Sequence, residues 1–281
     1  MIVSTVRGMS HTGTTQPSGQ PEPAATRRVH AARIGRISVD RVTFGEALDA
    51  LEALVAAGAG GTVVTPNVDH VVMAEVNAAF SDALARASLA LADGMPLLWA
   101  SRWFGTPLPE KISGSDFTLP VLQRAAERGF RVFLFGGADG SAEAARAVLA
   151  ERLPQLRIVG VLEPRVNMSD PASVHFALAD AIAASKPDLV VLGLGSPKQE
   201  LFAERVRHRL APAVLLSVGA TIDFLAGRVS RAPAWMSNNG LEWLYRLHKE
   251  PRRLYRRYLI RGPRFIGIVV RQLRHTRRAS P

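Results

Sequence analysis

The chain has 281 residues, of which 47% are hydrophobic, and it carries a formal net charge of +11. It contains no cysteine, which excludes a disulfide framework and any site built on a thiolate. The seven histidines show neither HxxxH nor HExxH spacing, and no apolar run reaches the ~18 residues that a bilayer span requires. We therefore expect no metal site and no transmembrane helix, in a chain long enough to bury one large core.

The two ends of the chain differ in composition from its middle. Residues 1–35 are rich in Ser, Thr, Pro, Gly and Gln and lack the apolar segment of a signal peptide, which predicts a disordered leader. Residues 228–281 hold 14 Lys and Arg but only two acidic residues, a net charge of +12, so the rest of the chain sums to −1. This asymmetry predicts a basic appendage with an anionic partner, either a nucleic acid or a membrane surface.

Between these ends, over residues 36–227, short apolar runs alternate with helical stretches. The expected strands lie within 37–44, 61–67, 89–94, 131–137, 156–164, 188–197 and 212–220. The expected helices lie within 45–58, 68–88, 95–105, 115–129, 141–154, 172–187 and 198–211. This alternation predicts an α/β domain with a Rossmann-like, mostly parallel sheet flanked by helices.

Several of the expected strands end in small, polar or acidic residues. They are Thr65, Asn67, Asp69, Asp93, Gly136, Gly137, Asp139, Gly193, Gly195, Ser196, Lys198, Gln199, Gly219, Thr221 and Asp223. Glycines at strand-to-helix turns let backbone amides approach a phosphate, so five such ends together favour a nucleotide-type pocket. Neither "FGGADGS" nor "GLGSPKQ" fits GxGxxG, however, and GxxxxGK[ST] does not occur.

Each of these residues also has an ordinary structural interpretation. A single glycine is most often a tight turn, and Asp93 alone is most often a turn or helix-cap aspartate. Thr65 and Asn67 are equally suited to capping the next helix, and Lys198 and Gln199 to a solvated first turn. The residue types alone leave both interpretations open.

Five stretches resemble one family in the right order along residues 38–270. They are "TPNVDHVVMA", "LADGMPLLWASRWFGTPLPEKISGSD", "FLFGGADGSAEAA", "PDLVVLGLGSPKQELF" and "SVGATIDFLAGRVSRAPAWMSNNGLEWLYRLHKEPRRLYRRY". The family that they resemble is the WecG/TagA/CpsF glycosyltransferases, glycosyltransferase family 26. The length of "GSPKQE" and of "GLEWLYRLHKEPRRLYRRY" makes the resemblance specific.

The resemblance implies a membrane-associated, inverting hexosyltransferase with a Rossmann-like fold, a C-terminal appendage and no metal or other cofactor. The implied donor is a UDP-sugar, carrying N-acetylmannosamine, its uronic acid or a related hexose. The implied acceptor is an undecaprenyl-diphosphate-linked sugar, used to build a cell-surface polysaccharide or a teichoic-acid-type polymer. Which sugar is transferred, and whether the protein is a homo-oligomer, stay open.

The resemblance also assigns roles to individual residues. It implies that Asp93 is the catalytic base, that Thr65 and Asn67 line the pocket around it, and that Gln199 lies near the substrates. The appendage arginines implied to hold the lipid diphosphate are Arg246, Arg253 and Arg256.

The leaving diphosphate needs stabilising groups of its own. Because the chain has no DxD motif to hold a metal-bound diphosphate, we expect cations and backbone amides to take that role. The candidates are Lys111, the arginine cluster of the appendage and the amides around Gly136 and Gly195. Gly137 and Lys198 are further expected substrate-binding residues.

The appendage also fits a membrane surface on physical grounds. Its cations are interleaved with Trp243, Tyr245, Leu247, Tyr255 and Tyr258, and such side chains favour the headgroup boundary. We therefore expect a cytoplasmic protein, peripheral on the inner face of a bacterial plasma membrane, with no nucleic-acid partner. A nucleic-acid-binding protein, the main alternative, explains the charge but not the strand ends, and a Rossmann oxidoreductase lacks its fingerprint.

Overall fold

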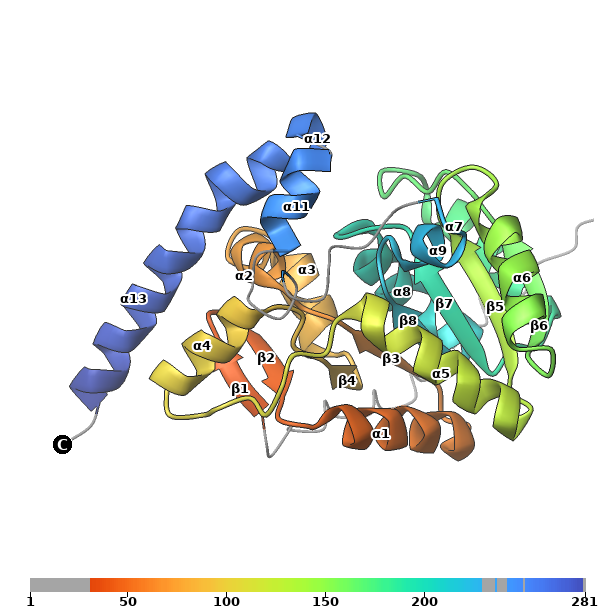
Figure 1. Cartoon of the computed structure of the whole chain (residues 1–281), viewed down its shortest axis with the longest axis horizontal. Helices are drawn as coiled ribbons and strands as arrows, with labels where there is room; N and C mark the ends of the chain where they lie inside the picture. The colour runs from red at the N-terminus through yellow and green to blue at the C-terminus, as the bar shows by residue number, and fades with distance from the viewer. Residues whose placement is uncertain (1–30, 229–235, 237–241, 250, 280–281) are drawn as a thin grey trace, which may run out of the picture.

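The computed structural model describes residues 31–228, 236, 242–249 and 251–279 (Figure 1). The strands are β1 (Ala31–Ile34), β2 (Ile37–Asp40), β3 (Gly61–Val64), β4 (Leu89–Ala90), β5 (Arg131–Gly136), β6 (Arg157–Leu162), β7 (Leu189–Gly193) and β8 (Val214–Ser217). The helices of the α/β body are α1 (Phe44–Ala57), α2 (Val68–Ala74), α3 (Ala78–Ala85), α4 (Met95–Trp103), α5 (Gly114–Arg128), α6 (Ser141–Arg152), α7 (Ala172–Ala184), α8 (Lys198–Leu210) and α9 (Thr221–Leu225). The C-terminal part holds α11 (Glu242–Lys249), α12 (Pro251–Tyr255), the π-helix η1 (Arg256–Arg261) and α13 (Gly262–Ala279).

Six strands form one parallel sheet in the order β4-β3-β8-β7-β5-β6, which confirms the predicted α/β, Rossmann-like class. Side chains alternate between the two faces of each strand, as the pleat requires. In β5, Val132 and Leu134 face one apolar cluster, whereas Phe133 and Phe135 face another. The sheet is therefore buried on both faces, which explains why its strands appear in the sequence as continuous apolar runs.

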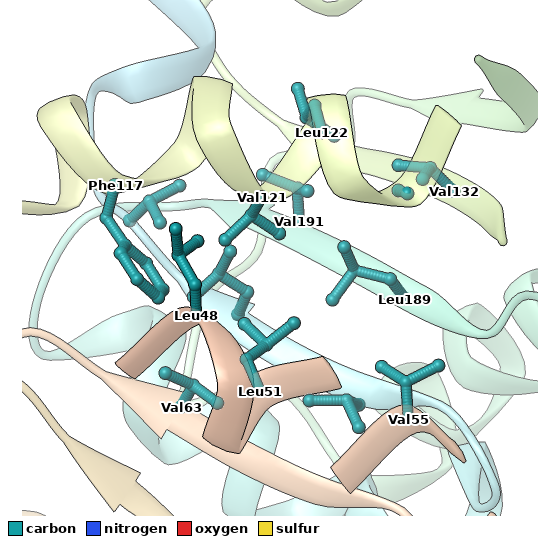
Figure 2. Packing of buried hydrophobic residues seen from close by; sticks show 14 of the residues in the cluster. Leu48, Leu51, Val55, Val63, Phe117, Val121, Leu122, Val132, Leu189 and Val191 are labelled. Carbon is teal, nitrogen blue, oxygen red and sulfur yellow. The ribbon is translucent and has the colours of Figure 1, made fainter. Parts of the chain in front are cut away.

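Helices cover both faces of this sheet. On one face, α1, α5 and α6 pack over β3, β5, β7 and β8, and Figure 2 shows Leu48 and Leu51 of α1 opposite Phe117 and Val121 of α5. On the other face, α7 and α8 pack over β5, β7 and β8 through residues such as Phe202. With both faces filled, the strand ends are the part of the sheet left to build a site.

A second core lies beside the β3–β4 end of the sheet. The hairpin β1–β2, the helices α2, α3 and α4, and the last helix α13 bury it together. Helix α13 contributes Phe265, Ile268 and Val269, all less than 8% exposed. Gln272 then fastens the helix to the hairpin turn, accepting from the Gly35 amide at 2.7 Å and donating to the Arg33 carbonyl at 2.8 Å.

Three expectations about the elements need correction. The leader expected over residues 1–35 is too long, because residues 31–34 form β1, in which Ala32 and Ile34 are buried; residues 1–30 lie outside the described part. The helix expected over 68–88 is divided into α2 and α3, since the Asn77 side chain caps a new helix by accepting from the Phe80 amide. The helix α13, expected in an appendage, is in its buried face an integral part of the second core.

Candidate active site

The carboxyl ends of β3, β4, β5, β7 and β8 meet at one edge of the sheet, where ligands of open α/β folds bind. The connection from β5 leads to β6 on one side, and the connection from β7 leads to β8 on the other. Neighbouring strands with divergent connections mark the switch point at which open α/β folds bind their ligands, and here that point lies at the ends of β5 and β7. Thr65 and Asp93 follow the more distant strands β3 and β4 at the same edge.

Asp93 is held by backbone hydrogen bonds on its own strand extension. Its amide donates to the Pro66 carbonyl at 2.8 Å, and the preceding Ala92 carbonyl accepts from the Ile112 amide at 2.8 Å. Gly94, with φ of 126°, turns the chain directly into α4, so the half-buried Asp93 stands just before the first turn of that helix. The backbone of Asp93 is therefore fixed at the ligand-binding edge.

Thr65 and Lys111 lie close to the same segment. Thr65 follows β3, is 7% exposed, and its hydroxyl donates to the Ser217 carbonyl of β8 at 3.4 Å. Lys111 precedes Ile112, which bonds the strand carrying Asp93, and its ammonium group lies 3.5 Å from the carboxylate of Asp116. The structure thus brings Thr65, Asp93 and Lys111 to one end of the sheet.

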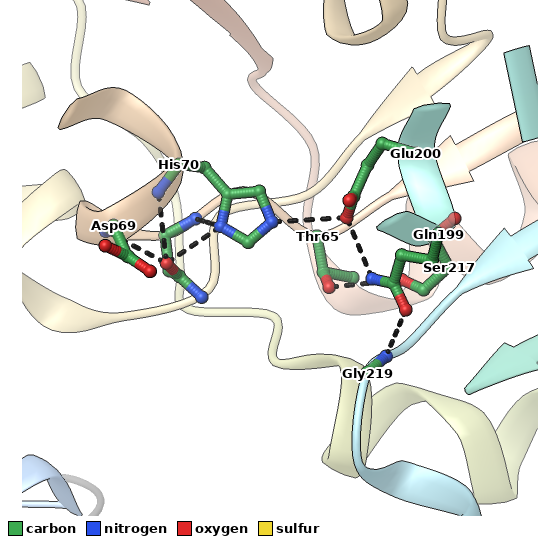
Figure 3. Close-up of polar contacts among 8 residues, drawn as sticks. Thr65, Asp69, His70, Gln199, Glu200, Ser217 and Gly219 are labelled. Atoms are coloured by element: carbon green, nitrogen blue, oxygen red, sulfur yellow. Dashed lines mark hydrogen bonds and ion pairs between the residues drawn. The ribbon is translucent and has the colours of Figure 1, made fainter. Parts of the chain in front are cut away.

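A buried polar chain links the β3 end to the β8 end (Figure 3). The Asn67 side-chain oxygen caps α2, accepting from the Asp69 and His70 amides, and lies 2.8 Å from Nδ1 of His70. The other ring nitrogen, Nε2, lies 3.3 Å from Oε1 of Glu200. We refer to Asn67, His70, Glu200, Gln199 and Gly219 as the buried polar chain.

The remainder of the buried polar chain fixes the amide of Gln199. Its Nε2 donates to Glu200 at 2.8 Å, and its Oε1 accepts from the Gly219 amide at 2.9 Å. A flipped amide would place donor against donor at Gly219, so the orientation of Gln199 follows from its partners. Gln199 is 3% exposed. The Gln199 side chain is therefore buried, and both its amide nitrogen and its amide oxygen form hydrogen bonds within the protein.

Glu200 is ionised in this setting. Burial of the carboxyl acts to raise the pKa of Glu200, but the hydrogen bond and charge of His70 and the hydrogen bond from Gln199 outweigh it, so the pKa is lowered. The oxygen Oε2 of Glu200 is buried and has no hydrogen-bond partner among the described residues. An ionised group with one unsatisfied oxygen in the protein interior is costly to keep.

The glycines at the ends of β5 and β7 differ in the structural reason for a glycine at each position. A Cβ on Gly136 would come within 2.9 Å of the Gly193 backbone, so this glycine lets β5 and β7 close together. The Gly137 amide donates to Gly193, and the next amides donate to the carboxylates of Asp223 and Glu163. Gly195, in contrast, has open space around its Cβ position and a φ of 74°. The turn Gly195–Lys198 leads into α8, with Lys198 exposed.

The C-terminal part reaches the same edge through one ion pair. Arg261 of η1 lies 2.9 Å from Asp69 in the first turn of α2, two residues from Asn67. Arg246, Arg253 and Arg256 are in α11, α12 and η1, and their side chains lie outside the described part. Their expected role at a lipid diphosphate therefore stays a prediction.

Two properties of the described residues bear on the site. No described helix combines the length and the apolar character needed to cross a bilayer. Among the same residues, no group of three or more His, Asp or Glu side chains gathers in a way that could hold a metal ion. Metal independence remains a prediction about the reaction.

Sequence reasoning missed His70 and Glu200 as members of the site. They are 130 residues apart, and a histidine in a helical stretch gives no local signal of its partner. Glu200 stands in the quoted "GSPKQE" stretch, and only its burial distinguishes it from a solvated first-turn acid.

The chain is similar in sequence to known proteins over most of its length. Residues 32–279 match the "Glycosyl transferase WecG/TagA/CpsF family". A protein of Bacillus spizizenii described as "N-acetylglucosaminyldiphosphoundecaprenol N-acetyl-beta-D-mannosaminyltransferase" is 33% identical over 222 residues, which cover 76% of this chain and 80% of the relative. The chain is thus a glycosyltransferase that belongs to the WecG/TagA/CpsF family.

Proposed function

We propose that the protein transfers a hexose-type sugar from a UDP donor to an undecaprenyl-diphosphate-linked sugar, with inversion at the anomeric carbon. The observation that carries the proposal is the position of Asp93, whose backbone is fixed at the ligand-binding edge of the sheet. The described activity of the Bacillus relative supports N-acetylmannosamine as the sugar and a diphosphoundecaprenol-linked N-acetylglucosamine as the acceptor.

In the proposed reaction, the oxygen of the acceptor hydroxyl forms a bond to the anomeric carbon of the donor sugar, and Asp93 accepts the proton of that hydroxyl. The bond from that carbon to the β-phosphate oxygen breaks, and its electron pair leaves with UDP. A general base of this kind accelerates a reaction by about 10²–10⁴-fold. One carboxylate is enough because the leaving group is a diphosphate, which needs charge stabilisation more than protonation.

The donor is proposed to lie at this switch point, at the ends of β5 and β7. The Gly195–Lys198 turn is the better candidate for its diphosphate, because the amides of Gly137, Ala138 and Gly140 already donate to protein groups. Lys111 and Lys198 are two of the cations that the body of the protein offers at this edge.

The acceptor is proposed to arrive from a membrane surface on the side of α11–α13. The described residues with large, exposed apolar side chains include seven in this part of the chain: Trp243, Leu244, Tyr255, Leu259, Ile260, Ile266 and Val270. Together with the charge of +12 over residues 228–281, they suit an anionic leaflet, where each basic residue contributes about 1 kcal/mol. Arg246, Arg253 and Arg256 are the proposed ligands of the lipid diphosphate, which arginine grips bidentately.

The test is a panel of UDP-sugars assayed with a diphosphoundecaprenol-linked N-acetylglucosamine in anionic vesicles, with and without an excess of EDTA. We expect one UDP-sugar to be transferred, EDTA to leave the rate unchanged, and the protein to sediment with the vesicles. Absence of transfer from every UDP-sugar would contradict the proposed reaction. Loss of the rate in EDTA and its return with Mg²⁺ would contradict the account of the leaving group.

A further inference from the structure

The buried polar chain joins two loops that are far apart in the sequence. One is the Pro66–Asn67 turn after β3, and the other is the Gly219 turn after β8. The Pro66 carbonyl also accepts from the Asp93 amide. Whatever fixes the Asn67 turn therefore fixes the backbone of the proposed base.

The contacts of the His70 ring tie it to both Asn67 and Glu200. The Asn67 oxygen accepts from the Asp69 and His70 amides and lies 2.8 Å from Nδ1 of the ring. The Asn67 amide donates to the same nitrogen at 3.3 Å. The second ring nitrogen, Nε2, faces the Glu200 carboxylate at 3.3 Å. The ring therefore bridges the Asn67 turn and the Glu200 carboxylate.

A purely structural role does not account for this pair. The side chains of His70 and Glu200 are 6% and 1% exposed, and the second Glu200 oxygen has no partner among the described residues. Apolar residues of similar volume at such buried positions are typically neutral or stabilising by comparison. The pair is better explained by the geometry that it imposes on the two loops.

We infer that His70, Glu200 and Gln199 are positioning residues that hold the Asn67 and Gly219 turns, and through Pro66 the backbone of Asp93, in the geometry for transfer. The inference rests on the proposed function. It differs from the role that the family resemblance implies for Gln199, because both ends of that amide are used inside the protein.

The test compares Glu200→Gln, His70→Gln and the double variant with Asp188→Asn, all in the full-length chain. Asp188 is a matched control because it forms an ion pair with Arg131 at the opposite edge of the sheet. We expect Glu200→Gln and His70→Gln to lower kcat at least ~10-fold and to change the Kd for UDP less than ~3-fold. The double variant, which leaves no unpaired buried charge, should lose no more than the worse single variant. Asp188→Asn should keep kcat.

Amide hydrogen exchange gives a second readout that does not depend on activity. We expect the Asp69, His70 and Gly219 amides to exchange at least ~10-fold faster in Glu200→Gln and to be unchanged in Asp188→Asn. A folded Glu200→Gln protein with the wild-type kcat would overturn the inference, as would an equal loss of kcat in Asp188→Asn. If Glu200→Gln does not fold, kcat and amide exchange are measured in the double variant instead, and a wild-type kcat there would overturn the inference. If the wild-type protein transfers no sugar, the proposed function fails, and unchanged exchange at the three amides would then overturn the inference by itself.

Discussion

The two edges of the central sheet each hold an ion pair, and the two pairs are built in opposite ways. At the amino edge, Asp188 accepts from the backbone and guanidinium of Arg131 at 2.7, 3.1 and 2.8 Å, with both side chains partly open to solvent. At the carboxyl edge, His70 meets Glu200 through one 3.3 Å contact in the protein interior. The pair with good geometry and solvent access serves stability. The buried pair with an unsatisfied oxygen lies where substrates are expected to bind.

The largest difference between the two edges is expected in turnover, when Asp93 is substituted. Asp93→Asn removes the proposed base without changing the size of the side chain, so turnover should fall by about 10²-fold or more while UDP still binds. Steady-state rates and UDP titration measure this. Asp188→Asn is the matched carboxylate change at the amino edge and should leave turnover unchanged. Near-normal turnover of Asp93→Asn would remove the base from the mechanism.

A second comparison concerns two glycines at the carboxyl edge. Gly136→Ala places a Cβ 2.9 Å from Gly193 at a φ of 97°, so the free energy of unfolding should drop by roughly 2–4 kcal/mol. Gly195→Ala meets open space and bears only the cost of its φ of 74°, about 1 kcal/mol. Urea unfolding of both variants measures the difference. Equal losses would show that close packing of β5 against β7 is not what requires Gly136.

The dependence of stability on pH should also distinguish the buried carboxylate. Since the pKa of Glu200 in the folded protein is lowered below its ordinary 4.5, the unfolded chain binds this proton more readily. The stabilisation is therefore present above about pH 4.5 and is lost as the pH falls through the lowered pKa. In Glu200→Gln, the free energy of unfolding should decline less between pH 6 and pH 3.5 than in the wild type. An identical decline would mean that Glu200 is not ionised in the folded protein.

The smallest effect is expected at the amino edge itself. The Arg131 hydrogen bonds lower the pKa of Asp188, although burial opposes this, so the pair stabilises the protein at neutral pH. Because both side chains are partly exposed, Asp188→Asn should lower Tm by only about 2–4 °C. Calorimetry measures the shift. A loss of more than ~10 °C would show that the two edges do not differ as described.

The sequence predicted the parts of the fold that depend on local pattern. Apolar runs such as "RVFLFGG" predicted β5 because the strand is buried on both faces, and Gly or polar residues after each run predicted the ligand-binding edge. The strand β1 was missed, although β2 was predicted, because Ala32 and Ile34 are buried by helices more than 30 residues away. The role of Gln199 was not predictable either, since only the fold shows which atoms its amide meets.

The hydrogen bonds between Gln272 and the β1–β2 turn have a consequence for how the chain acquires its structure. They join residues 237 and 239 positions apart, close to the full length of the chain. Contacts of such long range form late, because the loop that they close is costly in entropy. During synthesis, the hairpin and α2 leave the ribosome before α13 does. The apolar surface that α13 covers stays exposed until then. The same basic helix that is proposed to meet the membrane is therefore the part of the second core that is synthesised last, and the second core is complete only after α13 has been made.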